Sequence, residues 1–132
     1  FSEERKAHFP KRPDGQGGMV ADARVQLHCY SGSLELAREY VKLGATFSIG
    51  GPLTFKNARK TVEVLEGIPL QFIMSETDAP FLAPEPKRGR PNKTPYIEHV
   101  VRRMALLKDI GFDEAVRITS ENARRFFNIE VL

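Results

Sequence analysis

The amino-acid sequence predicts an α/β fold in which parallel strands are joined by crossover helices. The chain has 132 residues, of which 41% are hydrophobic and 28% charged, a composition typical of one soluble globular domain. Three short apolar segments with strand character alternate with segments of helical periodicity. Glycine or proline stands at most of the junctions between them. Strand–helix alternation at this spacing indicates βαβ units with right-handed crossovers.

The first strand–helix pair follows an N-terminal segment, residues 1–22, that is expected to be irregular because it is rich in proline, glycine and charge. The folded domain is therefore predicted over residues 23–132. Residues 23–29 predict a strand, since Val25 and Leu27 alternate with polar residues. A helix is expected over 34–43, ended by Gly44, and its apolar stripe consists of Leu36, Ala37, Tyr40 and Val41.

The second and third strands are expected at 45–50 and 70–77, on either side of a helix over 54–66. Gly67 and Pro69 are placed to end that helix. Its apolar face is formed by Phe55, Ala58, Val62 and Leu65.

The C-terminal part begins with a proline-rich loop, residues 79–95, which is long for a connection between a strand and a helix. Thr94 as N-cap and Pro95 at the first helical position predict a helix over 96–110. Two short helices are expected after Gly111, over 113–118 and 120–127. Their predicted buried residues are Val116, Ala123, Phe126 and Phe127.

Chemically versatile side chains stand where the three predicted strands end, which is where parallel α/β proteins bind ligands. His28 closes the first strand, Gly50 and Gly51 the second, and Glu76 and Asp78 the third. An imidazole and a carboxylate at one mouth are suitable metal ligands, and the glycines would leave space for a substrate. A strand-end histidine is also commonly a hydrogen-bonded structural residue, and an aspartate near proline a turn former. The residues alone thus indicate a metal or phosphate site.

Composition narrows the function classes further. The net charge of +3 permits a polyanionic ligand without requiring one. No apolar run reaches the roughly 20 residues that span a bilayer, and the charged segment after Phe1 is unlike a signal peptide. Cys29, the single cysteine, cannot form an intrachain disulfide. These features favour a cytoplasmic protein, and the absence of an initiator methionine leads us to expect a fragment of a longer one.

Four segments carry a family resemblance when taken together: HCYSGS, TFSIGGPLTFKN, ETDAPFLAPEPKRGRPN and TSENARRFFNI. In this order and spacing they resemble the C-terminal half of the TatD family of metal-dependent deoxyribonucleases, over about residues 25–129. The resemblance implies a metal-binding (β/α)₈ barrel of which the three strands are the sixth, seventh and eighth. It also implies hydrolysis of phosphodiester bonds in DNA, often single-stranded, with one or two divalent ions such as Mg²⁺, Mn²⁺ or Zn²⁺.

The same resemblance assigns roles to individual residues. His28 and Asp78 match metal ligands of the family, and Asp78 would also orient the attacking water or accept its proton. Because His28 would bind through a neutral ring nitrogen, activity is expected to fall at acid pH. Glu76 shares the orientation of Asp78 and is expected to support the site or act as an auxiliary ligand. Independently of the resemblance, Cys29 follows His28 in a predicted strand, so alternation of side chains leads us to expect it to point away from His28 and to be buried.

The basic residues of the loop after Asp78 have two possible roles. Arg88, Arg90 and Asn92 could position a phosphate, or Arg88 and Asn92 could fix the shape of the loop. His99 is expected to be solvated, and His8 has no strand before it.

Complete family members carry a His-x-His near their start, a glutamate after the fourth strand and a further histidine on the fifth, and none is recognisable here. The isolated chain is therefore expected to be inactive, or to depend on a missing N-terminal half or another copy of the chain. Two other possibilities stay open. One is an amidohydrolase-type enzyme acting on a small amide or ester, and the other is a non-catalytic half-barrel that pairs with another chain.

Overall fold

A three-stranded parallel sheet forms the centre of the computed structural model, which describes residues 9–129. Strands β3 (Gln26–Leu27), β4 (Thr46–Ile49) and β5 (Ile73–Ser75) lie in that order, so β4 is central. Phe47 of β4 pairs with Leu27 on one side and Ile73 on the other. The predicted parallel α/β arrangement is confirmed, although β3 is much shorter than expected.

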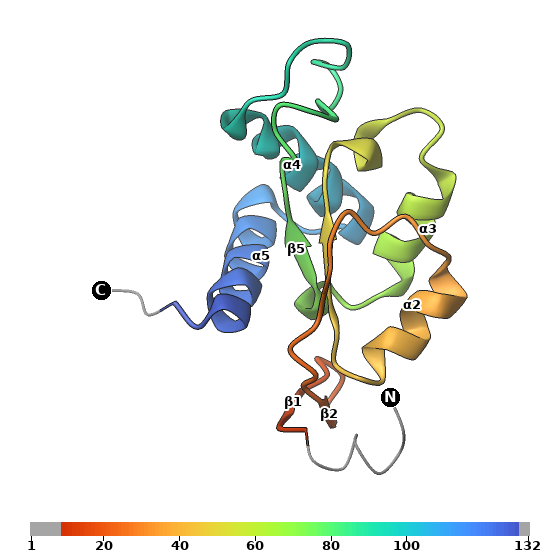
Figure 1. Cartoon of the computed structure of the whole chain (residues 1–132), viewed down its shortest axis with the longest axis vertical. Coiled ribbons are helices and arrows are strands. Elements are labelled where there is room, and N and C mark those ends of the chain that lie inside the picture. The colour runs from red at the N-terminus through yellow and green to blue at the C-terminus, as the bar shows by residue number, and fades with distance from the viewer. Residues whose placement is uncertain (1–8, 130–132) are drawn as a thin grey trace.

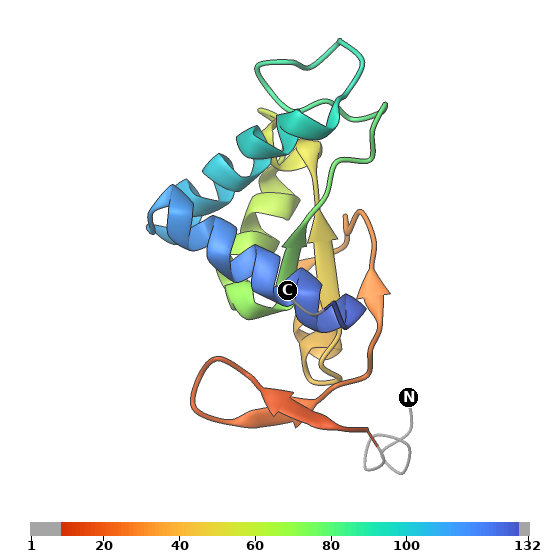
Figure 2. The ribbon, with the colours of Figure 1, turned by 90° about the vertical axis from the view of Figure 1, so that its left-hand side faces the viewer.

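Helices flank the sheet in the described part of the chain (Figure 1). They are α2 (Leu34–Val41), α3 (Arg59–Gly67), α4 (Ile97–Lys108) and α5 (Phe112–Phe127). In Figure 2 helix α5 crosses in front of β5, while α3 lies behind the sheet. Short 3₁₀ turns occupy Gly51–Thr54, Leu70–Phe72 and Thr94–Tyr96. None of the helices in the described range is long and apolar enough to cross a bilayer.

The core lies between the sheet and these helices. Its largest fully buried side chains come from strands, helices and 3₁₀ turns. Burial of their apolar surface is the main force that holds these elements together. These side chains include Phe47, Ile49, Leu53, Leu65, Phe72, Ile73 and Met104.

A β-hairpin corrects the expectation of an irregular N-terminal segment. Strands β1 (Lys11–Pro13) and β2 (Met19–Ala21) pair antiparallel, while residues 1–8 lie outside the described range. Arg12 is buried, with its guanidinium 4.4 Å from the centre of the Phe72 ring, and Nη2 donates to the Ala45 carbonyl oxygen. Burial lowers the pKa of Arg12 to about 10. The hairpin lies at the end of the sheet opposite the loop that follows β5 (Figure 1).

The helix boundaries differ from the sequence prediction in three places. Helix α3 begins at Arg59 instead of residue 54, because the chain first makes a 3₁₀ turn and an extended step at Phe55. Thr94 starts a 3₁₀ turn instead of capping α4. The two short C-terminal helices are one continuous helix, α5.

The predicted apolar stripes are also wrong at three positions. Leu36, Val116 and Phe127 were expected to be buried but are exposed, Phe127 by 55%. In α5 the face that packs inward carries Ala115, Thr119 and Asn122. Polar Thr119 and Asn122 are buried there because their side chains find backbone partners, which periodicity of apolar residues does not reveal.

Candidate metal centre

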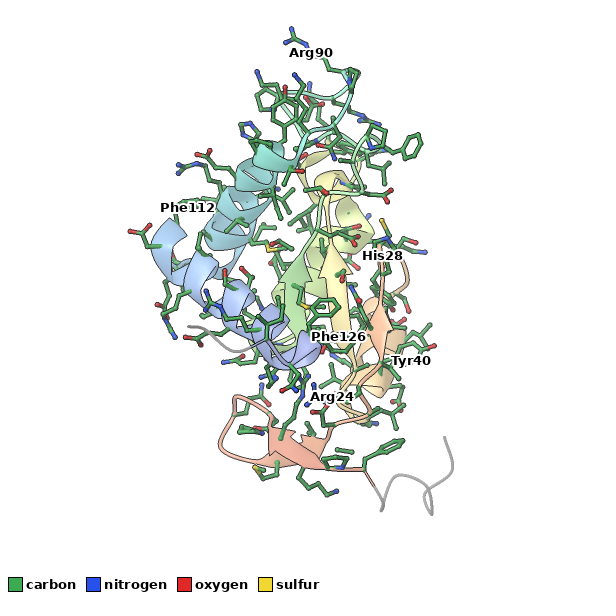
Figure 3. All side chains as sticks on the ribbon, turned by 60° about the vertical axis from the view of Figure 1, so that its left-hand side comes forward. Arg24, His28, Tyr40, Arg90, Phe112 and Phe126 are labelled. Carbon is green, nitrogen blue, oxygen red and sulfur yellow. The ribbon has the colours of Figure 1, made fainter. Side chains whose placement is uncertain are left out.

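Backbone pairing beyond the strands brings His28, Glu76 and Asp78 to one end of the sheet. The Tyr30 amide donates to the Ser48 carbonyl oxygen, and the Glu76 amide donates to that of Ile49. The residues that follow β3 and β5 are thereby held on either side of β4. The sequence prediction that an imidazole and two carboxylates share the carboxyl ends of the strands agrees with this geometry, and Figure 3 shows His28 at that end.

The His28 imidazole lies between the two carboxylates, one beside each ring nitrogen. Nδ1 contacts Glu76 Oε2, and Nε2 lies 3.8 Å from Asp78 Oδ1. The side chain of Glu76 is only 10% exposed, whereas that of His28 is 60% exposed. One carboxylate is therefore buried behind the ring, and the other faces the accessible side.

An open cleft of about 390 Å³ lies over these three residues. Helices contribute to its wall as well as strands, because Ile97 of α4 and Ala123 and Phe127 of α5 also line it. The other lining residues are Gln26, Ser48, Met74, Ser75 and Thr77.

These donors fit a divalent metal ion. Two ligands that each lie about 2.1 Å from one ion can be at most about 4.2 Å apart, and His28 Nε2 and Asp78 Oδ1 satisfy that limit at 3.8 Å. Both carboxylate oxygens of Glu76 are buried, and neither accepts a well-oriented hydrogen bond. A metal-binding histidine commonly directs its other ring nitrogen to a carboxylate, which is the position of Glu76.

The loop that carries Asp78 is held in shape by hydrogen bonds from Asn92 to its backbone. Asn92 is buried, and its Nδ2 donates to the carbonyl oxygens of Thr77 and Phe81. Of the two readings of Asn92, this geometry favours the one in which it fixes the loop, because its amide group faces the interior.

The two glycines after β4 do not both leave space for a substrate. A Cβ atom at Gly51 would overlap the carbonyl oxygen of Leu82, so this glycine makes room for the backbone of the loop. A Cβ atom at Gly50 would lie 3.1 Å from Glu76 Cγ. The expectation of an open gap is wrong at Gly51, whereas Gly50 lines a cavity of about 240 Å³ together with Cys29 and Tyr30.

Cys29 belongs to the same cluster, contrary to its predicted orientation. Its Sγ and one ligand atom each of His28 and Glu76 lie within 4.8 Å of one another. Burial and the adjacent Glu76 carboxylate raise the pKa of the Cys29 thiol to about 12. Strand β3 ends at Leu27 and Cys29 has a φ of 52°, so the alternation of side chains breaks just where the prediction relied on it.

The remaining candidate residues lie outside the cleft. Arg88 stacks over the Phe55 ring at 3.7 Å, and Arg90 is exposed at the outer tip of the loop, away from His28 (Figure 3). His99 is partly exposed on α4, its ring 6.1 Å from that of Tyr96. His8 lies outside the described residues.

An imidazole and two carboxylates lie together at the carboxyl ends of parallel strands. This arrangement suits a metal-dependent hydrolase. Comparison with known proteins identifies the family. The family described as TatD-related DNase matches residues 14–128, and the chain belongs to it.

Two curated relatives and one crystal structure illustrate the similarity. The uncharacterized metal-dependent hydrolase YabD of Bacillus subtilis strain 168 is 48% identical over 103 residues, which are 78% of this chain and 40% of YabD. The uncharacterized metal-dependent hydrolase YcfH of Escherichia coli K12 is 35% identical over 111 residues, covering 84% of this chain and 42% of YcfH. The crystal structure of the TatD homologue YjjV from Escherichia coli K12 superposes with a TM-score of 0.73 at 31% identity, covering 80% of this chain and 40% of YjjV. The chain therefore spans about 40% of the length of these relatives.

Proposed function

We propose that the chain is part of a divalent-metal-dependent nuclease that hydrolyses phosphodiester bonds in DNA, with a preference for single strands. The observation that carries this proposal is the convergence of His28 Nε2 and Asp78 Oδ1 at an accessible cleft. Family membership supports hydrolysis that depends on a metal ion.

The three strands correspond, in this proposal, to the sixth, seventh and eighth strands of a (β/α)₈ barrel. Strands β3 and β5 each have one neighbour in the sheet, so each has a free edge within the described residues. The chain also spans only about 40% of its relatives. The other strands would complete the sheet and add the ligands that two side chains cannot supply.

His28 and Asp78 would hold the ion, and Glu76 would orient His28. Glu76 Oε2 lies beside Nδ1 of His28, so its carboxylate would hold the ring with Nε2 available to the ion. When bound, the ion lowers the pKa of a coordinated water and polarises the phosphoryl oxygen. The Asp78 side chain is 36% exposed, so it can orient the attacking water and accept its proton.

The test is an activity measurement on the chain completed by the upstream part of a relative such as YabD. We expect degradation of single-stranded DNA with Mg²⁺ or Mn²⁺, and loss of most of it in Asp78→Asn. Asp109→Asn, an exposed position at the end of α4, is the matched control and should remain active. Equal activity of Asp78→Asn, or hydrolysis only of small amides or esters, would overturn the proposal.

A further inference from the structure

A second cleft of about 500 Å³ lies between helix α4 and the turn that precedes α3. It shares no lining residue with the metal centre. The residues that line it are Thr54, Phe55, Lys56, Glu85, His99, Arg102, Arg103 and Leu106.

The charge of this cleft is positive and largely uncompensated. Lys56 and Arg103 form no ion pair within the described part of the chain, whereas Arg102 is paired with Glu98 at 2.7 Å. Glu85 is the one carboxylate among the lining residues. Lys56 is exposed and Arg103 partly exposed, so both cations are available to an anionic ligand.

Aromatic rings extend the positive surface toward the loop after β5. Arg88 lies 3.7 Å from the centre of the Phe55 ring, and Lys87 lies 5.8 Å from that of Tyr96. Such contacts position a cation without neutralising it. Figure 2 shows this loop and the start of α4 at the same end of the molecule.

Lys56 and Arg103 line the cleft together with the rings of Phe55 and His99. Such a surface suits a single strand of nucleic acid, because cations follow the phosphates and an uncovered ring face can stack on a base. We propose that this cleft binds single-stranded nucleic acid. The inference rests on the proposed function for the identity of the polymer. Its carrying observations, the unpaired Lys56 and Arg103 and the stacked Arg88, are independent of the metal site.

The experiment measures binding of a fluorescent oligothymidylate by the 132-residue chain, by anisotropy, in EDTA so that no hydrolysis contributes. We compare the unmodified chain with Lys56→Gln/Arg103→Gln across a range of salt concentrations. The double variant should bind several-fold more weakly, and the slope of log affinity against log salt should fall by about 1.4, since each lost phosphate contact on a single strand removes about 0.7. Lys60→Gln/Arg124→Gln removes the same charge from exposed helix positions elsewhere and should leave both quantities nearly unchanged.

The outcomes separate this inference from the proposed function. Equal losses in the two double variants, or displacement of the oligonucleotide by polyglutamate at matched charge, would overturn the nucleic-acid cleft. In the chain completed as above, Lys56→Gln/Arg103→Gln should still hydrolyse a small chromogenic phosphodiester at the unmodified rate. Loss of that activity would place these residues in the catalytic machinery and contradict a separate binding role.

Discussion

At the scale of single residues, Glu76 illustrates how burial creates a functional constraint. Its carboxylate is held behind the His28 ring with both oxygens lacking a well-oriented hydrogen bond. Glu76→Gln keeps the shape of the side chain but removes its negative charge, so the His28 ring should be held less firmly. We expect metal affinity in the completed protein to fall about 10- to 100-fold, measured by calorimetric titration with Mn²⁺. Glu35→Gln, exposed on α2, is the control, and an unchanged affinity for Glu76→Gln would contradict the assigned role.

Asn122 provides the clearest stability prediction. Its Nδ2 donates to the carbonyl oxygens of Leu70 and Ile73 at 2.7 and 2.8 Å, and the residue is buried. Asn122→Ala leaves both carbonyl oxygens without this donor, so the free energy of unfolding should fall by about 2–4 kcal/mol. Urea unfolding measures the change. Exposed Asn57→Ala should cost far less, and similar losses in both variants would exclude this explanation.

The raised pKa of the Cys29 thiol predicts how the free energy of unfolding changes at alkaline pH. The pKa of its thiol is about 12 in the folded state, against about 8.5 in an unfolded chain. Between these values the folded state keeps a proton that the unfolded chain has lost, so the contribution is complete below about pH 8.5 and declines as the pH rises. Relative to Cys29→Ala, the unmodified chain should lose at most about 1.4 kcal/mol per pH unit in this window. Denaturation at a series of pH values tests this, and parallel curves would contradict it.

The comparison with Cys29→Ala is needed because another group, Arg12, titrates in the same pH range. Burial lowers the pKa of Arg12 to about 10, so above that pH the folded state loses a proton that the unfolded chain retains. This contribution to stability rises with pH and opposes that of Cys29. It is present in both proteins and cancels in their difference.

At the scale of elements, the alternation of strands and helices was predictable because each element carries its own local signals. The site residues His28 and Asp78 followed from topology, since parallel strands end at one edge. Other features depend on contacts that no local pattern encodes. Helix α5 continues through Thr119 and Ser120, and its buried Asn122 donates to the carbonyl oxygens of Leu70 and Ile73.

Long-range contacts explain most of the remaining errors. Asn122 finds its partners about fifty residues earlier in the chain, and Arg12 is buried against a ring on a distant 3₁₀ turn. The orientation of Cys29 was predicted wrongly because its own φ of 52° departs from the extended geometry of a strand. The periodicity of apolar residues predicts regular helices and strands. It does not predict contacts between distant segments or a residue with positive φ.

Gly51 yields a prediction about the loop as an element. A Cβ atom in Gly51→Ala would displace the Leu82 backbone, so the loop that carries Asp78 must shift. We expect weaker metal binding in the completed protein and faster proteolysis within residues 79–92. Gly111→Ala, where a Cβ atom meets no neighbour, is the control. Unchanged proteolysis and metal affinity in Gly51→Ala would show that the close approach is unimportant.

At the scale of the whole molecule, the sheet is open on both sides within the described residues. Phe127 is 55% exposed although it lines the cleft of the metal centre, which is consistent with a surface covered by further chain. Two ligands are too few to hold an ion tightly. We therefore expect the isolated chain to bind Mn²⁺ weakly by calorimetry and the completed protein to bind it much more tightly. Tight stoichiometric binding by the isolated chain would show that its own residues complete the site.

The fastening of the loop by Asn92 and Gly51 has a practical consequence. Gly89, next to the exposed tip at Arg90, has a φ of 88°, and an added Cβ atom there would meet no neighbour. A short tag or dye inserted after Gly89 should leave both clefts undisturbed. Such a reporter would stand beside the basic surface, where it could register the arrival of a polymer in real time.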